Sequence, residues 1–151
     1  MRGYARTPRS IEGVATFAGS DQLAAFADGL DIVVSVLPLT PETTGIMNAG
    51  FFGMLADGAF IINGGRGPQV DDDDLLAALG SGKLGGAALD VFAVEPLPQD
   101  HPFWTHPKVR VWPHVAAQTN ATSAAEQVAA AITAMMDGSE PANRVDWSRG
   151  Y

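Results

Sequence analysis

Three polar residues each follow an apolar run of the chain, and each carries a side chain suited to catalysis. Arg66, Glu95 and His114 come after runs that are expected to form strands. Ligands of parallel α/β sheets bind beyond the carboxyl ends of the strands, so these side chains are expected on one rim of the sheet. Arginine can hold a carboxylate with two hydrogen bonds, histidine can exchange a proton near neutral pH, and glutamate can fix the histidine tautomer. The set suits acid–base chemistry on a carboxylate-bearing ligand.

Each of the three residues also has a purely structural interpretation. A single histidine next to Pro113 is more often structural than catalytic, and Arg66 in its glycine-rich turn can simply bond to main-chain carbonyls. Glu95, which precedes a proline, fits an exposed loop equally well. Their common position after strands is the observation that favours a shared function.

Other polar clusters are interpreted as structural. His101 and His106 lie in a proline-rich segment and are expected at the surface, and with His114 they do not have metal-ligand spacing. The four aspartates at 71–74 are expected to begin a helix, where carboxylates meet the positive end of the helix dipole. We therefore predict no metal site.

Short apolar runs alternate with helical segments, which is typical of an α/β fold with a mostly parallel sheet. The predicted strands are 14–17, 32–37, 59–63, 86–91 and 109–112. Their nearly continuous apolar character predicts strands that are covered on both faces.

Helices are predicted between the strands. The expected helices are 21–28 with Ser20 as cap, 48–55, 71–79 ending at Gly80, and 122–136 ending near Gly138. Val128, Ile132 and Met135 fit one face of the last helix. The segment 92–107 is expected to be an ordered loop, and the tail 140–151 is expected to be irregular.

Composition limits the class of protein. The chain has 151 residues, 46% of them hydrophobic, a net charge of −8 and no cysteine. This length suits one domain, the acidity disfavours non-specific nucleic-acid binding, and the lack of cysteine excludes disulfides and thiolate metal sites. No apolar run is long enough to cross a bilayer, and the N-terminus does not resemble a secretory signal. We expect a cytoplasmic protein.

A glycine fingerprint is missing from this α/β pattern. No G-x-G-x-x-G follows an apolar strand, and the closest run, at 64–67, has the wrong spacing. The sequence opens without a preceding strand, so we expect that an N-terminal part is absent. The strand at 32–37 is then expected to have an unpaired edge and exposed apolar surface, and the chain to self-associate or fold only loosely.

Four segments resemble signatures of the D-2-hydroxyacid dehydrogenase family. They are SVLPLTPET at 35–43, NGGRG at 63–67, LDVFAVEPLP at 89–98 and PHVAAQT at 113–119. They follow the family's order and spacing, and the resemblance covers essentially the whole chain. The ending, at 146–151, looks closest to the glyoxylate/hydroxypyruvate reductase branch.

The resemblance implies an incomplete doubly wound, Rossmann-like parallel sheet with helices on both faces, which lacks its first βα unit. Residues 1–122 would form the NAD(P)-binding domain without its glycine fingerprint. Residues 123–151 would be a helix and tail that in the family return to the substrate domain.

The resemblance also implies catalytic roles in the NAD(P)H-dependent reduction of a small 2-oxo acid of the glyoxylate or hydroxypyruvate type. Arg66 would bind the carboxylate and carbonyl of the substrate. His114 would protonate the carbonyl oxygen as hydride arrives, and Glu95 would orient His114 and favour its charged form.

The cofactor-binding residues implied by the resemblance come from several segments. They are Arg6, Thr7, Arg9, Leu37, Pro38, Thr43, Gly65, Arg66, Asp90, His114 and Ala116. Asp90 would lie near the nicotinamide carboxamide. Arg6 stands where an acid would select NAD, so NADP is favoured, with NAD as the second choice. A solvated basic end is the alternative for Arg6 and Arg9.

Two functions are compatible with these observations. The first is a reductase that needs the missing half, with a small 2-oxo acid as its ligand, no nucleic-acid or membrane partner, and a homodimer as the full-length form. The second is a truncated, non-catalytic α/β remnant that binds a nucleotide or self-associates. An in-frame strand with G-x-G-x-x-G encoded upstream of Met1 would separate the two.

Overall fold

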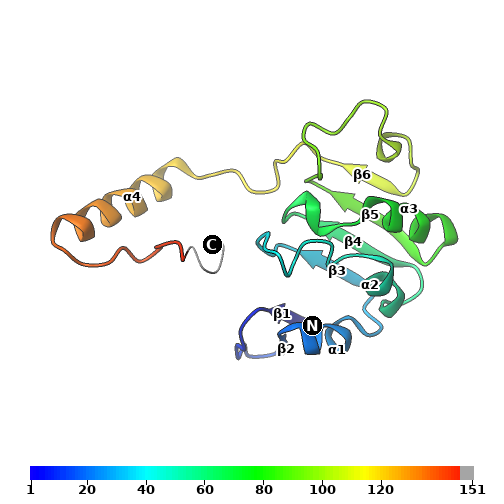
Figure 1. Cartoon of the computed structure of the whole chain (residues 1–151), viewed down its shortest axis with the longest axis horizontal. Coiled ribbons are helices and arrows are strands. Elements are labelled where there is room, and N and C mark those ends of the chain that lie inside the picture. The colour runs from blue at the N-terminus through cyan, green and yellow to red at the C-terminus, as the bar shows by residue number, and fades with distance from the viewer. Residues whose placement is uncertain (147–151) are drawn as a thin grey trace. The chain divides into compact units, whose positions relative to one another are not determined.

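A computed structural model describes residues 1–146 and divides the chain into two compact units, Met1–His114 and Val115–Tyr151. All the strands of the described residues belong to the first unit, and the second unit contains one long helix (Figure 1).

The first unit contains two parallel sheets. The larger has the strand order β3-β4-β5-β6, formed by β3 (Ile32–Ser35), β4 (Ala59–Asn63), β5 (Leu84–Leu89) and β6 (Val109–Val111). The smaller pairs β1 (Arg2–Ala5) with β2 (Ala15–Ala18). In the larger sheet Ile61 lies between Val33 and Ala87 in register. The parallel, Rossmann-like arrangement agrees with the fold class predicted from the sequence.

Short helices connect these strands. They are η1 (Ser20–Gln22), α1 (Leu23–Ala27), α2 (Ala49–Met54), η2 (Gly67–Gln69), α3 (Asp72–Ser81) and η3 (Pro102–Trp104). Asn48 and Asp71 cap α2 and α3, because their side chains accept hydrogen bonds from the Phe51 and Asp74 amides. The aspartates at 71–74 therefore begin a helix, as predicted.

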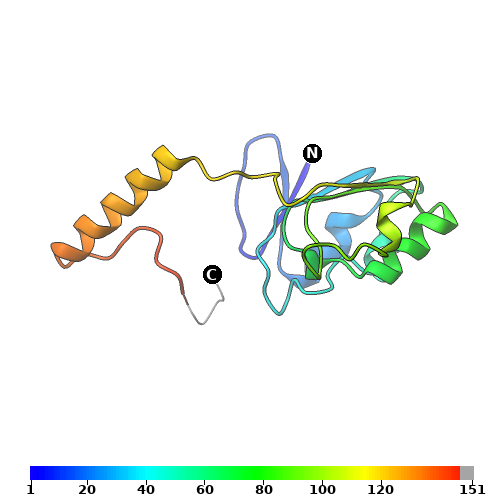
Figure 2. The same cartoon turned by 90° about the horizontal axis from the view of Figure 1, so that it is seen from above.

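The core lies between these helices and one face of the larger sheet. Val33 and Ile61 point from the sheet into a cluster that includes Phe52 of α2 and Leu75 of α3, and all four are buried. Seen from above, α2 and α3 lie on the same side of the sheet (Figure 2). The segment 92–107 adds buried Phe103 to this core, so it is an ordered, packed loop as expected.

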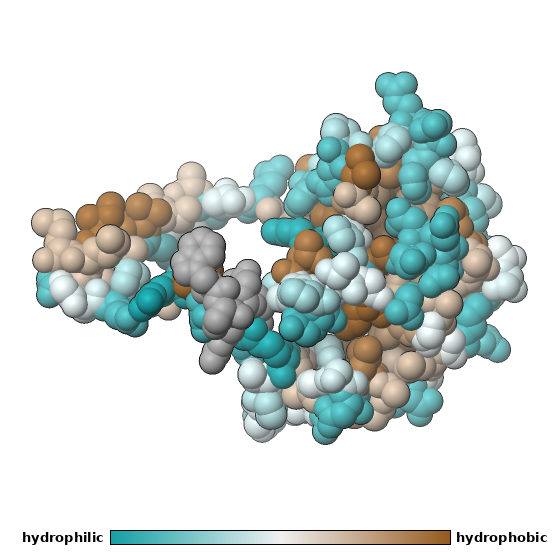
Figure 3. Space-filling model, in the orientation of Figure 1, coloured by the Kyte–Doolittle hydropathy of each residue, from teal (hydrophilic) through white to brown (hydrophobic). Residues whose placement is uncertain are grey.

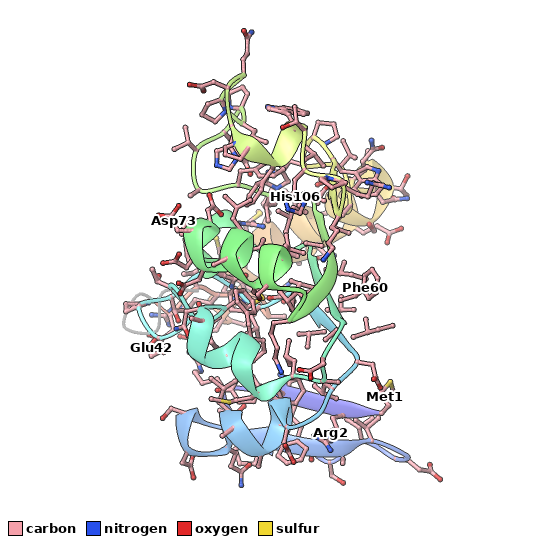
Figure 4. The ribbon with its side chains drawn as sticks, turned by 90° about the vertical axis from the view of Figure 1, so that its right-hand side faces the viewer. Met1, Arg2, Glu42, Phe60, Asp73 and His106 are labelled. Carbon is pink, nitrogen blue, oxygen red and sulfur yellow. The ribbon has the colours of Figure 1, made fainter. Side chains whose placement is uncertain are left out.

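The opposite face of the larger sheet is apolar and exposed. Ile32 and Val34 of β3 are 60% and 59% exposed, and Phe60 and Ile62 of β4 are 50% and 39% exposed. Phe60 projects from the side of the sheet that faces away from α2 and α3 (Figure 4). The prediction that both faces of these strands are covered is therefore wrong for this chain.

Several predicted boundaries shift by one or two residues. Strand β3 ends at Ser35 because the next residues run toward Pro38, and β5 begins at Leu84 and ends before Asp90. Helix α3 continues through Gly80 to Ser81, and Gly82 caps its end with a φ of 83°, the left-handed conformation that glycine adopts readily. Ends of elements are the least certain part of pattern-based prediction.

The beginning of the chain differs more from its prediction. Strand β1 was not predicted, because the run Arg2–Ala5 contains only one aromatic and no β-branched residue. Ser20 does not cap a helix, and it lies inside η1, which starts after Gly19. The helix predicted from 21 to 28 is divided into η1 and α1.

The second unit contains α4 (Ala121–Met136), which Asn120 caps by accepting a hydrogen bond from the Ser123 amide. Val128, Ile132 and Met135 are exposed in this unit, and apolar side chains gather on the helix in Figure 3. Residues 140–146 form neither helix nor strand, as predicted, and the rest of the predicted tail lies outside the described residues. Among the helices of residues 1–146, none is long and apolar enough to span a membrane.

We predict that the chain alone self-associates through β3 and its exposed face. Val34→Lys should reduce this association, because a charge on an exposed strand opposes both edge pairing and apolar contact. Val128→Lys is the matched control, since Val128 is 58% exposed but lies on α4. Sedimentation over a range of concentrations measures the effect. A monomeric parent chain with a sharp cooperative melt would contradict the prediction.

Candidate active site

The catalytic candidates lie at the carboxyl edge of the larger sheet. Arg66 follows β4, Glu95 follows β5 and His114 follows β6, and the three strands run in the same direction. The Nδ1 atom of His114 lies 2.9 Å from Oε2 of Glu95. Two residues 19 positions apart therefore meet because their strands are neighbours.

Glu95 is held on both carboxylate oxygens. Its Oε1 accepts a hydrogen bond of 2.9 Å from the Phe92 amide, while Oε2 faces His114. The hydrogen bond with His114 lowers the pKa of Glu95, and the Phe92 amide and the positive charge of Arg66 lower it further. The carboxylate is therefore kept ionised and fixed in orientation.

The backbone of His114 turns sharply at the end of β6. Its φ is 56°, in the left-handed region that residues other than glycine seldom adopt. About half of the side chain is exposed. Because Nδ1 faces Glu95, a proton exchanged with a ligand would be carried on Nε2.

Glu95 and His114 line a cavity of about 550 Å³. Its other walls include Trp104 and Trp112, which are partly exposed. Trp104 is anchored by a hydrogen bond of 2.8 Å from its indole Nε1 to the Pro98 carbonyl. The acid–base pair thus lies in a mainly apolar hollow with room for a small ligand.

The position of Arg66 is compatible with both the structural and the ligand-binding role considered for it. Its Nη1 donates to the Gly65 carbonyl at 2.7 Å, which is the structural role considered for it. The residue as a whole is exposed, and its charge reaches Glu95, whose pKa it lowers. The guanidinium is therefore near the acid–base pair and can still offer N–H groups to an anion.

Sequence reasoning missed Gln69, which ties the Arg66 turn to the segment after β3. The side chain is fully buried. Its Oε1 accepts from the Arg66 amide at 3.1 Å and from the Ser35 hydroxyl at 3.3 Å. Its Nε2 donates to the carbonyls of Leu37 at 2.9 Å and Pro38 at 3.1 Å. The only signal in the sequence is a polar residue between Pro68 and Val70, at the end of a glycine-rich turn.

Two glycines allow the Arg66 turn to pack closely against its neighbours. A Cβ on Gly65 would lie 2.5 Å from Oε1 of Gln69, and a Cβ on Gly67 would lie 1.8 Å from the carbonyl carbon of Phe92. Gly67 therefore packs directly on the segment whose amide orients Glu95. No side chain larger than hydrogen can occupy either position without moving these contacts.

The predicted cofactor residues after β3 belong to a loop held by its own bonds. The Thr43 hydroxyl donates to the Pro38 carbonyl at 2.8 Å and accepts from the Thr40 amide at 2.8 Å. Leu37 and Pro38 are fixed from the other side by Gln69. Their carbonyls are thus already engaged, so a ligand would contact the outer surface of this loop.

The remaining cofactor candidates follow the carboxyl ends of strands in both sheets. Arg6 follows β1, and its charge contributes to lowering the pKa of Glu42, after the larger effect of the Thr40 hydrogen bond. Asp90 directly follows β5 and is largely buried. Two further candidates, Thr7 and Arg9, are exposed beyond Arg6. Ala116 belongs to the second unit, so its role stays a prediction.

The histidines predicted at the surface are in fact partly buried. His101 lies 3.6 Å from Asp72 and packs against Phe103, and His106 accepts a hydrogen bond from the Lys108 amide. Burial raises the pKa of Asp72, and the neighbouring His101 opposes that rise. Neither histidine takes part in a group of metal ligands, since residues 1–146 contain no such group.

Comparison with known proteins identifies the class that this fold and edge define. Residues 1–116 match the family model described as "D-isomer specific 2-hydroxyacid dehydrogenase, NAD binding domain". The chain belongs to the D-isomer specific 2-hydroxyacid dehydrogenase family.

The curated relatives belong to one branch of the family. The chain is 50% identical over 151 residues to glyoxylate/hydroxypyruvate reductase A of Serratia proteamaculans, and 48% identical to the same-named protein of Yersinia enterocolitica. Both matches cover 100% of this chain and 48% of the relative. The chain thus spans about half the length of the curated relatives that it matches.

Solved structures agree with this assignment. A D-isomer specific 2-hydroxyacid dehydrogenase from Xanthobacter autotrophicus, in complex with NADPH, superposes with a TM-score of 0.96 at 47% identity, covering 99% of this chain and 62% of that one. An NADPH-dependent glyoxylate/hydroxypyruvate reductase from Sinorhizobium meliloti, in complex with NADP, superposes with a TM-score of 0.93 at 41% identity. This match covers 99% of this chain and 49% of that one.

We predict that His114→Ala raises the pKa of Glu95, because its largest source of stabilisation as a carboxylate is then lost. The pKa should stay below the ordinary value, since the Phe92 amide and Arg66 remain. NMR titration of the carboxyl carbon measures it. Asp57, whose pKa Lys83 lowers, is the internal control and should not change. An unchanged pKa for Glu95 would show that the pair does not form in solution.

We predict that Gln69→Leu destabilises the chain by about 2–4 kcal/mol, because it removes a buried partner from the Arg66 amide, the Ser35 hydroxyl and the Leu37 carbonyl. Gln22→Leu is the control: Gln22 also accepts an amide hydrogen bond, from Ala18, but is exposed, so water replaces it. Urea unfolding compares the two. Equal losses would mean that the Gln69 hydrogen bonds add nothing to the stability of the site.

Proposed function

We propose that this chain provides the proton-donating and nucleotide-binding half of an NADPH-dependent reductase of small 2-oxo acids, of the glyoxylate or hydroxypyruvate type. The Glu95–His114 pair, 2.9 Å apart beside the positive charge of Arg66, is the observation that carries the proposal. Such a site combines a proton donor with a carboxylate-binding cation, which are the two groups that a 2-oxo acid requires. In its complete form we expect a cytoplasmic homodimer.

Each residue has a distinct part in this reaction. Arg66 binds the substrate carboxylate and sets the ketone beside His114. As negative charge develops on the carbonyl oxygen, Nε2 of His114 gives it a proton. Glu95 keeps the ring oriented through Nδ1 and stabilises its charged form before the transfer. The walls of the cavity around the pair are mainly apolar.

The described residues fit part of the cofactor. When bound, NADPH supplies the hydride. The fixed loop at 37–43, against which Gly65 packs closely, is suited to hold the nicotinamide end. Arg6 is suited to the 2′-phosphate, because it extends from the carboxyl end of β1. No G-x-G-x-x-G of this sequence joins a strand to a following helix, since the one at 80–85 runs from the end of α3 to the start of β5. The pyrophosphate must therefore be bound by a segment supplied from elsewhere.

A fusion tests the proposal as a whole. The part of the Serratia proteamaculans relative that precedes the matched region is joined to Met1, and oxidation of NADPH is followed with glyoxylate and with hydroxypyruvate. We expect turnover with the fusion and little or none with the chain alone. A folded fusion that binds NADPH but reduces neither acid would favour the non-catalytic alternative.

We predict that His114→Ala in the fusion lowers turnover by roughly 10²–10⁴-fold, the range for loss of a general acid, while NADPH affinity stays nearly unchanged. Arg66→Ala should act mainly on substrate affinity, because it removes the carboxylate contact. Steady-state kinetics and fluorescence titration separate the two effects. His106→Ala is the control and should leave turnover unchanged. Normal turnover of His114→Ala would overturn the site assignment.

We predict that Arg6→Ala in the fusion weakens NADPH binding by roughly 10- to 100-fold, the range expected for a charged contact with phosphate. NADH binding should change little, because NADH has no 2′-phosphate. Arg110→Ala, an exposed arginine on β6, is the control. Equal loss for both cofactors would remove Arg6 from the 2′-phosphate site.

A further inference from the structure

Two segments form separate walls of the candidate active site. The turn at 63–67, which we call the substrate turn, carries Arg66. The loop at 37–43, which we call the cofactor loop, is suited to the nicotinamide end of the cofactor. Gln69 of η2 is fully buried and bonds to both segments. Its side chain is therefore placed to connect the two walls.

The carboxamide of Gln69 reaches both walls at once. Its Oε1 accepts a hydrogen bond from the Arg66 amide of the substrate turn at 3.1 Å. Its Nε2 donates to the carbonyls of Leu37 at 2.9 Å and Pro38 at 3.1 Å, both in the cofactor loop. Because Oε1 and Nε2 belong to one planar group, the carboxamide cannot follow one wall without straining its bonds to the other.

Close packing around this carboxamide leaves little room for either wall to move alone. A Cβ on Gly65 would lie 2.5 Å from Oε1 of Gln69 and 3.0 Å from the carbonyl oxygen of Leu37. The main chain adds a second link, since the Met47 amide, just beyond the cofactor loop, donates to the Gln69 carbonyl at 2.9 Å. A bond lost inside such a buried network leaves a polar group unsatisfied, so a partial rearrangement is costly.

A ligand that orders one wall therefore lowers the cost of ordering the other. When NADPH lies against the cofactor loop, the carbonyls of Leu37 and Pro38 are held in place, and with them Gln69 and the Arg66 amide. Ordering of shared structure produces positive cooperativity even without a change of shape. The effect is the same in the reverse direction, because coupling between two binding sites is reciprocal.

We propose that Gln69 is a positioning residue that couples the two ligands, so that NADPH and the 2-oxo acid each bind more tightly when the other is present. The inference rests on the proposed function, since it uses the assignments of the cofactor loop and of Arg66. Because it is fully buried, Gln69 contacts neither ligand and acts through the main chain of the two walls.

Binding equilibria of the fusion test the coupling without any turnover. Oxamate, a carboxylate whose amide carbonyl does not accept hydride, replaces the 2-oxo acid. Calorimetry measures its dissociation constant without and with saturating NADPH, and the ratio of the two values is the coupling factor. We expect a factor of about five or more, and the same factor for NADPH without and with oxamate. A fusion that reduces glyoxylate but has a factor of one would overturn the inference. A coupled fusion that reduces neither acid would support it and contradict the proposed reaction instead.

Two buried amide side chains provide matched variants. Gln69→Leu removes the bonds to both walls and should bring the coupling factor close to one. Asn63→Leu is the control, because Asn63 is also buried but its bonds to the Arg66 carbonyl and from the Gly65 amide stay within the substrate turn. It should weaken oxamate binding equally without and with NADPH, so the factor stays at the value of the parent fusion. Loss of coupling in both variants, or in neither, would contradict the role of Gln69.

Hydrogen exchange in the parent fusion tests the same link without any substitution. NADPH alone should slow exchange of the Arg66 amide, which lies on the substrate turn, because this amide donates to Gln69. The Asp74 amide, which donates to Asp71 at the start of α3, is the reference and should not change. NMR follows both amides. An Arg66 amide that exchanges at the same rate without and with bound NADPH would overturn the inference.

Discussion

The main-chain ladder of the larger sheet is the constraint on which the rest of the structure depends. Four parallel strands in the order β3-β4-β5-β6 end at one edge, so loops far apart in the sequence are brought side by side. Arg66, Glu95 and His114 lie at that edge because each follows a different strand of the sheet. The ladder also explains the exposed apolar face, because the same alternation that buries Val33 and Ile61 turns Ile32 and Phe60 outward.

Contacts with the main chain set much of the geometry of the candidate catalytic side chains at this edge. The Phe92 amide orients Glu95, Glu95 orients His114, and Gln69 holds the Arg66 turn against the loop after β3. Asn63 adds a second brace, since it donates to the Arg66 carbonyl and accepts from the Gly65 amide while fully buried. Buried and fully bonded amides of this kind make a site rigid, because each lost bond leaves an unsatisfied group.

The parallel α/β class and the common location of the three catalytic candidates could both be predicted from the sequence. Both depend on strand direction and on polar residues that follow apolar runs. Gln69 and Asn63 could not be predicted, since their partners lie on other loops and only the folded chain brings them together. Strand β1 was missed because its residues have little β-propensity and it forms by pairing with β2. Exposed apolar surface on β3 was expected from the absent first strand, whereas the apolar runs by themselves predicted covered faces, because an apolar run indicates what a strand can bury and not what is present to cover it.

At Gly67 and Phe92 the loop after β4 packs tightly against the loop after β5. A Cβ at Gly67 would overlap the main chain at Phe92, so neither loop can be reshaped while the other keeps its path. A substitution at Gly67 therefore also disturbs the main chain whose Phe92 amide holds Glu95.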